Sequence, residues 1–499
     1  MYTGDLIGGS KMFKLKKRNF FAAILACLIL CGCQKAPQSN TAENTFATGA
    51  IDNNGVHQTQ TVPKEEKAIH REFTSTDGSV QFEMDIETDV AVSTLPVVKV
   101  QPHYLTVEDV QRVAYALFGN VDFYEREPYE TATYSKAEIQ NRLSNWSKYV
   151  STEELRSLYG SEDNSFIQKL VRDYIQDYTL KMESASNDNP HVRCKWEFKE
   201  ESRYTFSPDN IEAEQLADDN SAIMANCTQN DIRYCFDAVT RNKNDYKLNI
   251  ISVYIDGSNS PFGIDEAIAR ASLCRTQKPE QTKIDTIAEK AKKILNEVAL
   301  GQWELESCTL RTDMIGDTPE YSICINALPV LSGGKAVDSS PFFKLKGEDV
   351  YASNYYLTSA QIVFAPDGTL LSFELTSPID IIEVSEQVNI LNTSDEMINQ
   401  GINRLSLTDC LAFYTGNSKD LDGIPTLCNV NITSGFYGLI RTKVINQENE
   451  YQYIPSFVLT GTYEISNKNT GEVYMYKDIP GILLALDAAD GTVLIAPGA

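Results

Sequence analysis

The chain has 499 residues, of which 42% are hydrophobic and 23% are charged, and its formal net charge is −25. This mixture is typical of a globular protein and excludes a fully disordered chain, a collagen-like rod and a coiled coil. The length predicts more than one domain. Because phosphate binding needs clustered Lys and Arg, the acidic balance argues against a nucleic-acid partner.

The first residues have the pattern of a bacterial lipoprotein signal peptide. A basic segment at 14–18 precedes an apolar run at 20–31, which is too short to cross a bilayer as a helix. The run leads into the lipobox Leu30-Cys31-Gly32-Cys33, where the small Gly32 gives a peptidase access and the Cys33 thiol accepts the lipid. We therefore expect a membrane anchor at Cys33 and a position at the extracytoplasmic face of the bacterial cell membrane. A plain secretory signal is the alternative.

A polar segment follows the lipobox. Residues 34–68 are rich in Gln, Asn, Thr, Ala and Glu and contain no Leu. Such a composition buries too little apolar surface to offset the entropy lost on ordering. We interpret 1–32 as the signal peptide and 33–70 as the lipidated Cys with a flexible tether. Met1 and Met12 are alternative starts of translation.

The first folded region is predicted to be an α+β domain over 71–275. Residues 80–86 alternate between apolar and polar side chains, as in a half-buried strand. Thr106 begins a helix that Gly119 ends, and the capping box at 135–138 begins another. A third helix over 167–182 and strands near 193–198, 222–228, 233–239 and 248–255 complete the region.

The second folded region is predicted over 276–499, again with antiparallel sheets packed against helices. It contains a helix from Thr282 to Gly301, strands at 303–310 and 321–327, and a hairpin that turns at Asp367-Gly368-Thr369.

The same order of elements returns later in this region. A helix at 394–405 is followed by strands and by a hairpin that turns at Asp490-Gly491-Thr492. We therefore expect duplicated helix-plus-sheet units at 283–376 and 394–496. Chance recurrence of common turn chemistry is the alternative.

Several segments of the mature chain together resemble a known set of sequences. They are Pro96-Val97-Val98-Lys99-Val100, Tyr134-Ser135-Lys136-Ala137-Glu138-Ile139, Ser377-Pro378-Ile379 and Gly438-Leu439-Ile440-Arg441. Together with the signal and the tether, they resemble a family of uncharacterised Gram-positive surface lipoproteins, a domain of unknown function. The resemblance covers most of the mature chain. It carries no catalytic residue with it.

Two segments near the C-terminus read Tyr453-Ile454-Pro455-Ser456-Phe457 and Leu486-Asp487-Ala488-Ala489-Asp490-Gly491. They are similar to the last strands of PepSY-type domains, although Ser456-Phe457 stands where those domains usually carry Ala-Trp or Val-Trp. The resemblance implies a role in protease inhibition or envelope regulation, without a catalytic centre.

The cysteines beyond Cys33 favour disulfides over a metal site. No Cys-x-x-Cys pair is present, which argues against a zinc ribbon or a thioredoxin-like site. Outside the cytoplasm, cysteines that flank a hairpin turn are candidates for pairing. The candidate pairs are Cys227 with Cys235, Cys308 with Cys324, and Cys410 with Cys428. Buried free thiols are the alternative.

The sequence offers little catalytic chemistry. It has four histidines and no His-Glu-x-x-His, Gly-x-Ser-x-Gly or P-loop motif. A Ser-His-Asp hydrolase would have to use His103 or His191. We therefore predict that the chain is not an enzyme and needs no cofactor or metal.

Tyrosine clusters are the remaining candidate site. Exposed aromatic rings beside polar residues stack on sugars or anchor a partner, although packing in strands and core is the alternative. The candidates are Tyr124, Tyr129, Tyr134, Tyr351, Tyr355 and Tyr356. We thus expect a non-catalytic surface lipoprotein that binds a protein or an envelope polymer. The alternative hypothesis is a hydrolase of a cell-wall or dietary polymer that uses Asp/Glu pairs.

Overall fold

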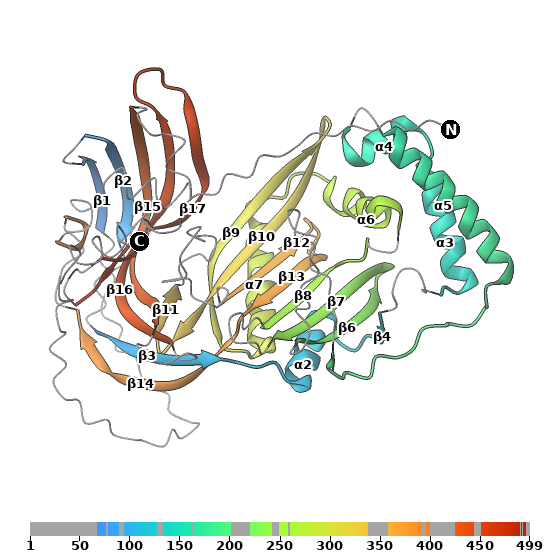
Figure 1. Ribbon diagram of the computed structural model, residues 1–499, viewed down its shortest axis with the longest axis horizontal. Coiled ribbons are helices and arrows are strands. Elements are labelled where there is room, and N and C mark those ends of the chain that lie inside the picture. Colours follow the sequence, from blue (N-terminus) through green and yellow to red (C-terminus); the bar gives the residue numbers. More distant parts are fainter. Residues whose placement is uncertain are drawn as a thin grey trace, which may run out of the picture. The chain divides into compact units, whose positions relative to one another are not determined.

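The computed structural model describes residues 67–75, 78–88, 94–126, 133–161, 164–200, 220–241, 249–257, 260–337, 358–390, 396–399, 425–443, 451–489, 491 and 493–495 (Figure 1). The chain divides between residues 60 and 61, and every described residue belongs to the second part. This part has a mixed α+β fold in which antiparallel strands predominate, so the predicted fold class is confirmed at this level. The signal peptide, Cys33 and most of the tether lie outside the described residues.

One antiparallel sheet, which we call the central sheet, has the strand order β6-β7-β8-β13-β12-β10-β9. The strands are β6 (Asn220–Gln229), β7 (Ile232–Arg241), β8 (Asn249–Ile255), β13 (Leu370–Thr376), β12 (Ser359–Phe364), β10 (Thr318–Leu331) and β9 (Gln302–Ile315). The short strands β4 (Phe123–Glu125) and β5 (Lys199–Glu200) pair with β6.

Helices α2 (Val107–Phe118) and α7 (Gln281–Val298) cover one face of the central sheet. Their apolar stripes share a core with alternate residues of the strands, because successive strand residues project from opposite faces. This core includes Val113 of α2, Leu295 of α7, and Phe236 and Ile325 of the sheet.

A helical layer forms a smaller core of its own. It contains α3 (Lys136–Trp146), α4 (Thr152–Tyr159), α5 (Ser165–Ser184) and α6 (Ile264–Cys274), which follows the 3-10 turn η1 (Pro261–Gly263). The predicted helix starts at Thr106 and Ser135 are confirmed, since both residues form a complete capping box.

The other strands form a second sheet. They are β1 (Lys67–Thr74), β2 (Val80–Thr88), β3 (Thr94–Pro102), β14 (Ile379–Asn389), β15 (Thr426–Lys443), β16 (Tyr451–Asn467), β17 (Val473–Asp487) and β18 (Val493–Ile495). Most of its pairings are antiparallel, while β15 pairs with β2 in parallel. The short β11 (Gly334–Val337) pairs with both β10 and β15 and so joins the two sheets.

The predicted boundary between residues 275 and 276 does not coincide with a boundary between the sheets. Strand β8 pairs with β13, and β3 pairs with β14 and β16, so residues from both predicted domains share each sheet. The segment 283–376 supplies strands to the central sheet, whereas the described strands of 394–496 belong to the second sheet.

One predicted strand is wrong. Residues 193–198 do not form a strand, and Arg193 makes only an isolated bridge to Tyr124. Trp196 has a φ of 51°, which interrupts the extended conformation that a strand requires.

Candidate functional site

Two predicted disulfides are wrong, because their cysteines project from opposite faces of the central sheet. Cys227 lies opposite Tyr234, whereas Cys235 lies opposite Asn226. Directly opposite residues share a face and successive residues alternate between faces, so the Cys227 and Cys235 thiols point apart. Both cysteines are free and buried, and burial raises the pKa of each thiol to about 12.

The same one-residue offset separates the second pair. Cys308 lies opposite Ile325 and Cys324 lies opposite Thr309, and both thiols are free. Of the third predicted pair, Cys428 is a buried free thiol and Cys410 lies outside the described residues.

The predicted aromatic site is only partly described. Tyr129, Tyr351, Tyr355 and Tyr356 lie outside the described residues. Tyr124 is half-buried on β4, with its ring centroid 5.8 Å from that of His191. Tyr134 is 8% exposed, so the expectation that its ring is available to a partner is corrected: the ring packs in the core of the helical layer.

Tyr134 lies instead within a group of ionisable side chains, half-buried except for the buried Asp256, which we call the ionic cluster: Glu138, Arg142, His191, Arg233, Asp256 and Asp265. The guanidinium carbon of Arg142 is 4.5 Å from the centroid of the Tyr134 ring. The Tyr134 hydroxyl is buried without a hydrogen-bond partner. Burial raises its pKa, and the neighbouring Arg142 only partly opposes this effect.

On one side, the ionic cluster joins the start of α3 to the central sheet. Glu138 Oε1 lies 2.8 Å from His191 Nε2, while its Oε2 accepts from the backbone and hydroxyl of Ser135. Burial opposes ionisation of Glu138, but these bonds outweigh it and lower its pKa to about 2. Arg233 of β7 pairs with the buried Asp256 at 3.0 Å.

On the other side, the ionic cluster joins α3 to α6. Asp265 accepts from Arg142 Nη1 at 2.8 Å and from the indole Nε1 of the fully buried Trp146 at 2.6 Å. Burial raises the pKa of Asp265 despite these donors. Every carboxylate of the cluster is therefore engaged by a cation or a hydrogen-bond donor, an arrangement that holds the helical layer in place.

The face of the central sheet opposite α2 and α7 carries a row of polar side chains, which we call the polar row. Strand register places Ser307, Asn326, Gln361, Glu374, Ser252 and Asp237 side by side on successive strands. Asn326 Nδ2 donates to Ser307 Oγ at 2.9 Å, and Gln361 Nε2 donates to Asn326 Oδ1 at 2.9 Å.

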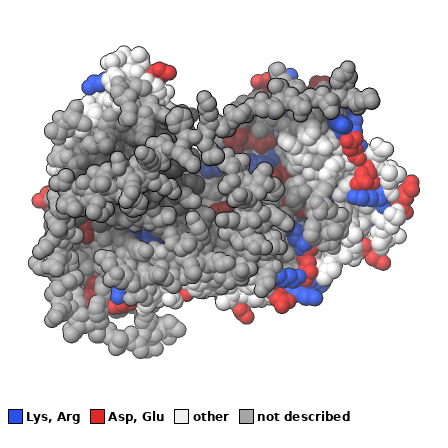
Figure 2. Space-filling view, in the orientation of Figure 1, with Lys and Arg blue, Asp and Glu red and all other residues white. Residues whose placement is uncertain are grey.

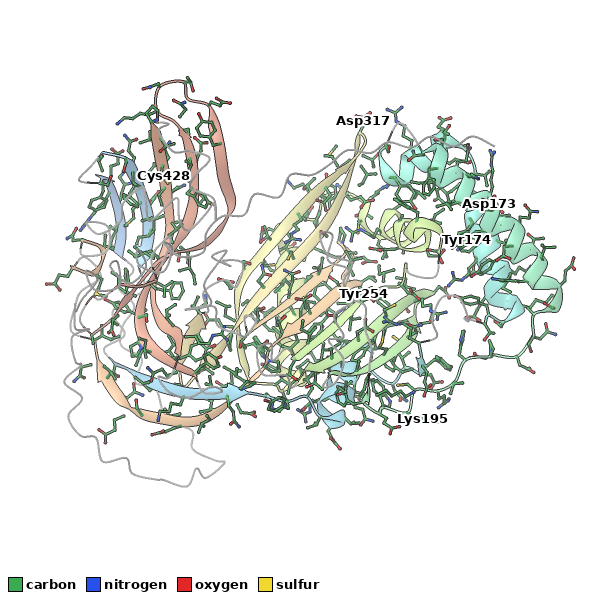
Figure 3. The ribbon with its side chains drawn as sticks, viewed as in Figure 1. Asp173, Tyr174, Lys195, Tyr254, Asp317 and Cys428 are labelled. Atoms are coloured by element: carbon green, nitrogen blue, oxygen red, sulfur yellow. The ribbon has the colours of Figure 1, made fainter. Side chains whose placement is uncertain are left out.

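An ion pair closes one end of the polar row. Arg126 lies 2.9 Å from Asp237. Tyr254, which is labelled in Figure 3, donates its Oη–H to the same carboxylate at 3.2 Å. Glu374 of the polar row and the neighbouring Tyr254, 37% exposed, reach solvent, whereas Asp237 is buried and the other members of the row are half-buried. This face offers amide, hydroxyl, carboxylate and phenol groups along an extended path.

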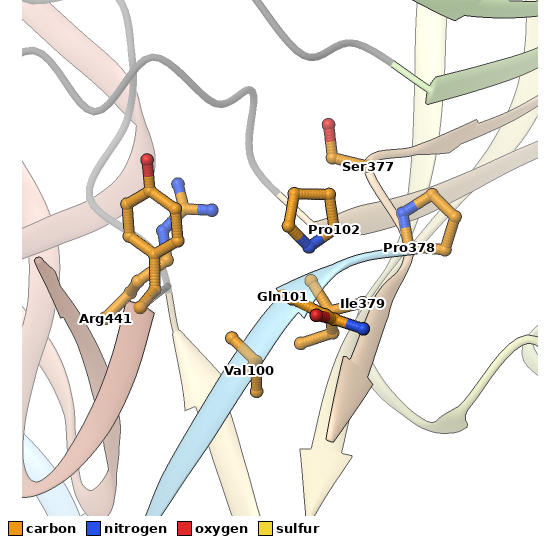
Figure 4. A pocket seen from close by; sticks show the side chains of 8 residues that line it. Val100, Gln101, Pro102, Ser377, Pro378, Ile379 and Arg441 are labelled. Atoms are coloured by element: carbon orange, nitrogen blue, oxygen red, sulfur yellow. The ribbon is translucent and has the colours of Figure 1, made fainter. Parts of the chain in front are cut away.

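A cavity, which we call the two-turn cavity, lies where two hairpin turns meet α2 and α7. It is partly open to solvent, has a volume of about 170 Å³ and is lined by Leu117, Gln229, Asn230, Lys290, Ile294, Phe364, Asp367, Gly368, Thr369 and Leu370. The predicted Asp367-Gly368-Thr369 turn is confirmed and forms one of its walls. A much smaller hollow, about 10 Å³, lies beside Pro102, Ser377 and Arg441 and has room for about one water molecule (Figure 4).

Of the two candidate catalytic histidines, His103 has both ring nitrogens engaged. Nε2 lies 2.9 Å from Asp109 and Nδ1 lies 2.8 Å from Asp380. Burial opposes the charge of His103, but hydrogen bonds to the two carboxylates outweigh it and raise its pKa. A charged imidazole with both nitrogens occupied is a structural bridge and has no lone pair to accept a proton. Among the described residues, no group of His, Cys, Asp and Glu could hold a metal ion.

Sequence reasoning missed Lys290 and most of the ionic cluster. Basic and acidic side chains are interspersed on the described surface in Figure 2, so charge alone singles out none of them. Within the described ranges, no helix is both long and apolar enough to cross a membrane.

Comparison with known proteins identifies no family. No family model matches the chain, and no curated protein matches it. Among solved structures, an uncharacterized protein from Eubacterium rectale is similar, with 10% sequence identity and a TM-score of 0.38. The match covers 83% of this chain and 90% of that one.

Proposed function

We propose that the chain is a membrane-anchored, non-catalytic surface lipoprotein that binds a protein or an envelope polymer. The polar row is the observation that carries the proposal. Its side chains run across successive strands of a sheet whose other face is backed by α2 and α7, so they sit on a rigid platform. Hydrogen-bonding groups spaced by neighbouring strands suit an extended chain with repeated polar groups.

The lipobox supplies the anchor in this proposal. Lipid on Cys33 would hold the polar row near the envelope, at the extracytoplasmic face of the cell membrane. The Cys33→Ser variant is expected to lose incorporation of a labelled fatty acid and to leave the membrane fraction. Cys31→Ser is the matched control, and equal loss in both variants would contradict lipidation at Cys33.

We also propose the relationship to Gram-positive surface lipoproteins and the PepSY-like character of the C-terminal region, with duplicated units at 283–376 and 394–496. The pairing of β16 with β17 supports the PepSY-like part, since Phe457 lies opposite Leu486. This pairing joins the two segments on which the resemblance rests. A regulatory role toward an envelope enzyme would follow from it.

The binding proposal is tested by capture from cell envelopes with the full-length lipoprotein in detergent. Gln361→Ala is expected to weaken recovery of the partner, because it breaks the hydrogen-bonded polar row. Gln387→Ala on β14 is the matched control, since that glutamine is exposed on the other sheet. Recovery of no partner, together with turnover of a glycan or peptide, would instead support the hydrolase hypothesis.

A further inference from the structure

The two-turn cavity is built from segments far apart in the sequence. Leu117 comes from α2, Lys290 and Ile294 from α7, and the turns at 229–232 and 364–370 supply the rest. Gln229 Nε2 donates to the Phe118 carbonyl at 3.3 Å, which ties the first turn to the end of α2. The cavity is therefore formed by elements that are far apart in the sequence but pack together in the fold. Its volume gives room for roughly ten water molecules.

Lys290 is the only basic residue in the cavity lining, and it differs from its neighbours on α7. Lys292 pairs with Glu289 at 2.6 Å and Lys293 pairs with Glu297 at 3.7 Å. Lys290 Nζ instead donates to the Gly368 carbonyl at 2.7 Å and lies 5.2 Å from the centroid of the Phe364 ring. Within the described part of the chain it forms no ion pair, although the chain has a surplus of carboxylates.

The ammonium of the exposed Lys290 has further donor capacity. An ammonium has three N–H donors, and the Gly368 carbonyl takes one. Burial lowers the pKa of Lys290, and Asp367 only partly opposes this. A carboxylate placed in the cavity would accept the free N–H groups and compensate the charge.

The other groups on the surface of the cavity are mostly polar. Asp367 Oδ1 accepts from the Thr369 backbone at 2.8 Å, and its other oxygen is available to a donor from a ligand. Gln229, Asn230 and Thr369 add amide and hydroxyl groups. Among the apolar side chains of the lining, Leu117 is partly exposed, whereas Ile294, Phe364 and Leu370 are buried beneath the polar groups. An ammonium and a carboxylate on one lining match the charged and N–H groups at the end of a peptide.

We propose that the two-turn cavity binds the α-carboxylate end of an amino acid or a short peptide. The carboxylate pairs with Lys290, the ligand N–H groups point toward Asp367, and a small side chain lies beside Leu117. This site is separate from the polar row, so the inference goes beyond the proposed function. A ligand of this size has few atoms to contribute, and dissociation constants between roughly 1 μM and 1 mM are expected.

The test is calorimetric titration of the full-length lipoprotein in detergent with three probes. Alanyl-alanine carries both charges, N-acetyl-alanyl-alanine keeps only the carboxylate, and alanyl-alanine amide keeps only the ammonium. Both carboxylate probes are expected to bind, and the amide about ten- to hundred-fold more weakly. Equal binding of the acetylated and free dipeptides would indicate the end of a longer peptide, whereas preference for the free dipeptide would indicate a free amino acid or dipeptide.

Lys290→Gln is expected to lower the affinity for N-acetyl-alanyl-alanine by the same ten- to hundred-fold. Lys283→Gln is the matched control, because Lys283 is an exposed lysine on the same helix and does not line the cavity. Circular dichroism and thermal unfolding of both variants show whether the fold is retained. The proposal is overturned if the amide binds as well as the acids, if both variants bind alike, or if none of the probes binds at 10 mM, roughly ten times the weakest expected constant.

Discussion

His103 bridges two carboxylates that belong to different elements, and its removal should destabilise the fold in a pH-dependent way. Nε2 contacts Asp109 at the start of α2, and Nδ1 contacts Asp380 at the start of β14. His103 is 22% exposed, Asp109 7% and Asp380 47%. A hydrogen bond between charged groups contributes about 1.5–3 kcal/mol when shielded, and an exposed pair contributes about 0–1 kcal/mol. His103→Gln is therefore expected to lower the free energy of unfolding by about 2–3 kcal/mol near pH 5.5.

The direction of the pH dependence follows from the two pKa shifts. The folded pKa of His103 is raised, so its stabilisation is fully present below the unfolded value and is lost as the pH rises through the folded value. Burial opposes the charge of Asp109, but bonds from Thr106 and His103 outweigh it and lower its pKa. The Asp109 contribution is present above its unfolded value and is lost as the pH falls through its folded value. Arg112 Nη1 also lies 3.5 Å from Asp109 Oδ1.

Urea denaturation of the wild type and His103→Gln at pH 5.5 and pH 8.5, roughly one unit below and two above the ordinary histidine pKa, measures this difference. The loss in the variant should be smaller at pH 8.5, where the wild-type imidazole has begun to lose its charge. His70→Gln is the control, because His70 is exposed on β1 and should show little loss at either pH. A loss of the same size at both pH values would refute the charged bridge.

Three further predictions concern stability and thiol chemistry. Asp265→Asn removes the carboxylate that lies 2.8 Å from the largely shielded guanidinium of Arg142 and should cost about 3 kcal/mol in urea denaturation. Gly461→Ala should cost more than about 2 kcal/mol, since its Cβ would lie 2.0 Å from a backbone oxygen of β15. In alkylation followed by mass spectrometry of the unreduced protein, exposed Cys308 should react first, whereas Cys235 should react only after unfolding.

Each of these predictions has its own control. Asp313→Asn removes an exposed carboxylate of β9 and should leave stability within about 0.5 kcal/mol of the wild type. Thr462→Ala, on the residue after Gly461, should be similarly mild, and equal losses in both would argue against the close approach of β15 to β16. A disulfide between Cys308 and Cys324, found as a link that is lost on reduction, would contradict the strand register of β9 and β10.

Features set by neighbouring residues could be predicted from the sequence. Thr106 and Ser135 begin helices because their side chains and the carboxylates three residues later satisfy the first backbone groups. The hairpin turn at Asp367-Gly368 could be predicted for the same reason. Such a turn needs a residue with positive φ, and Gly368 adopts a φ of 90°. These interactions span a few residues and do not depend on what packs against them.

Register and long-range pairing could not be predicted in the same way. The sequence placed Cys227 and Cys235 on either side of a turn, yet a one-residue offset puts their thiols on opposite faces. The pairing of β8 with β13 joins strands more than 100 residues apart, and nothing local specifies it. The ionic cluster depends on such contacts, because its residues come from α3, α6 and β7 and from the segments that follow α5 and β8.

The two-turn cavity arises from the way α2 and α7 lie on one sheet. Helix α2 precedes β6, β7 and β8, α7 precedes β9, β10, β12 and β13, and the two sets of strands meet where β8 pairs with β13. The helices contact each other, and one hairpin turn from each set reaches the same end of the sheet. The gap between the two helix-and-strand sets is lined at its surface by polar side chains of the two turns, Gln229, Asn230, Asp367 and Thr369. These groups tolerate water, so core side chains need not fill the gap. Lys290 lines this gap from α7, where the carboxylate of the ligand that we propose would be its counter-ion.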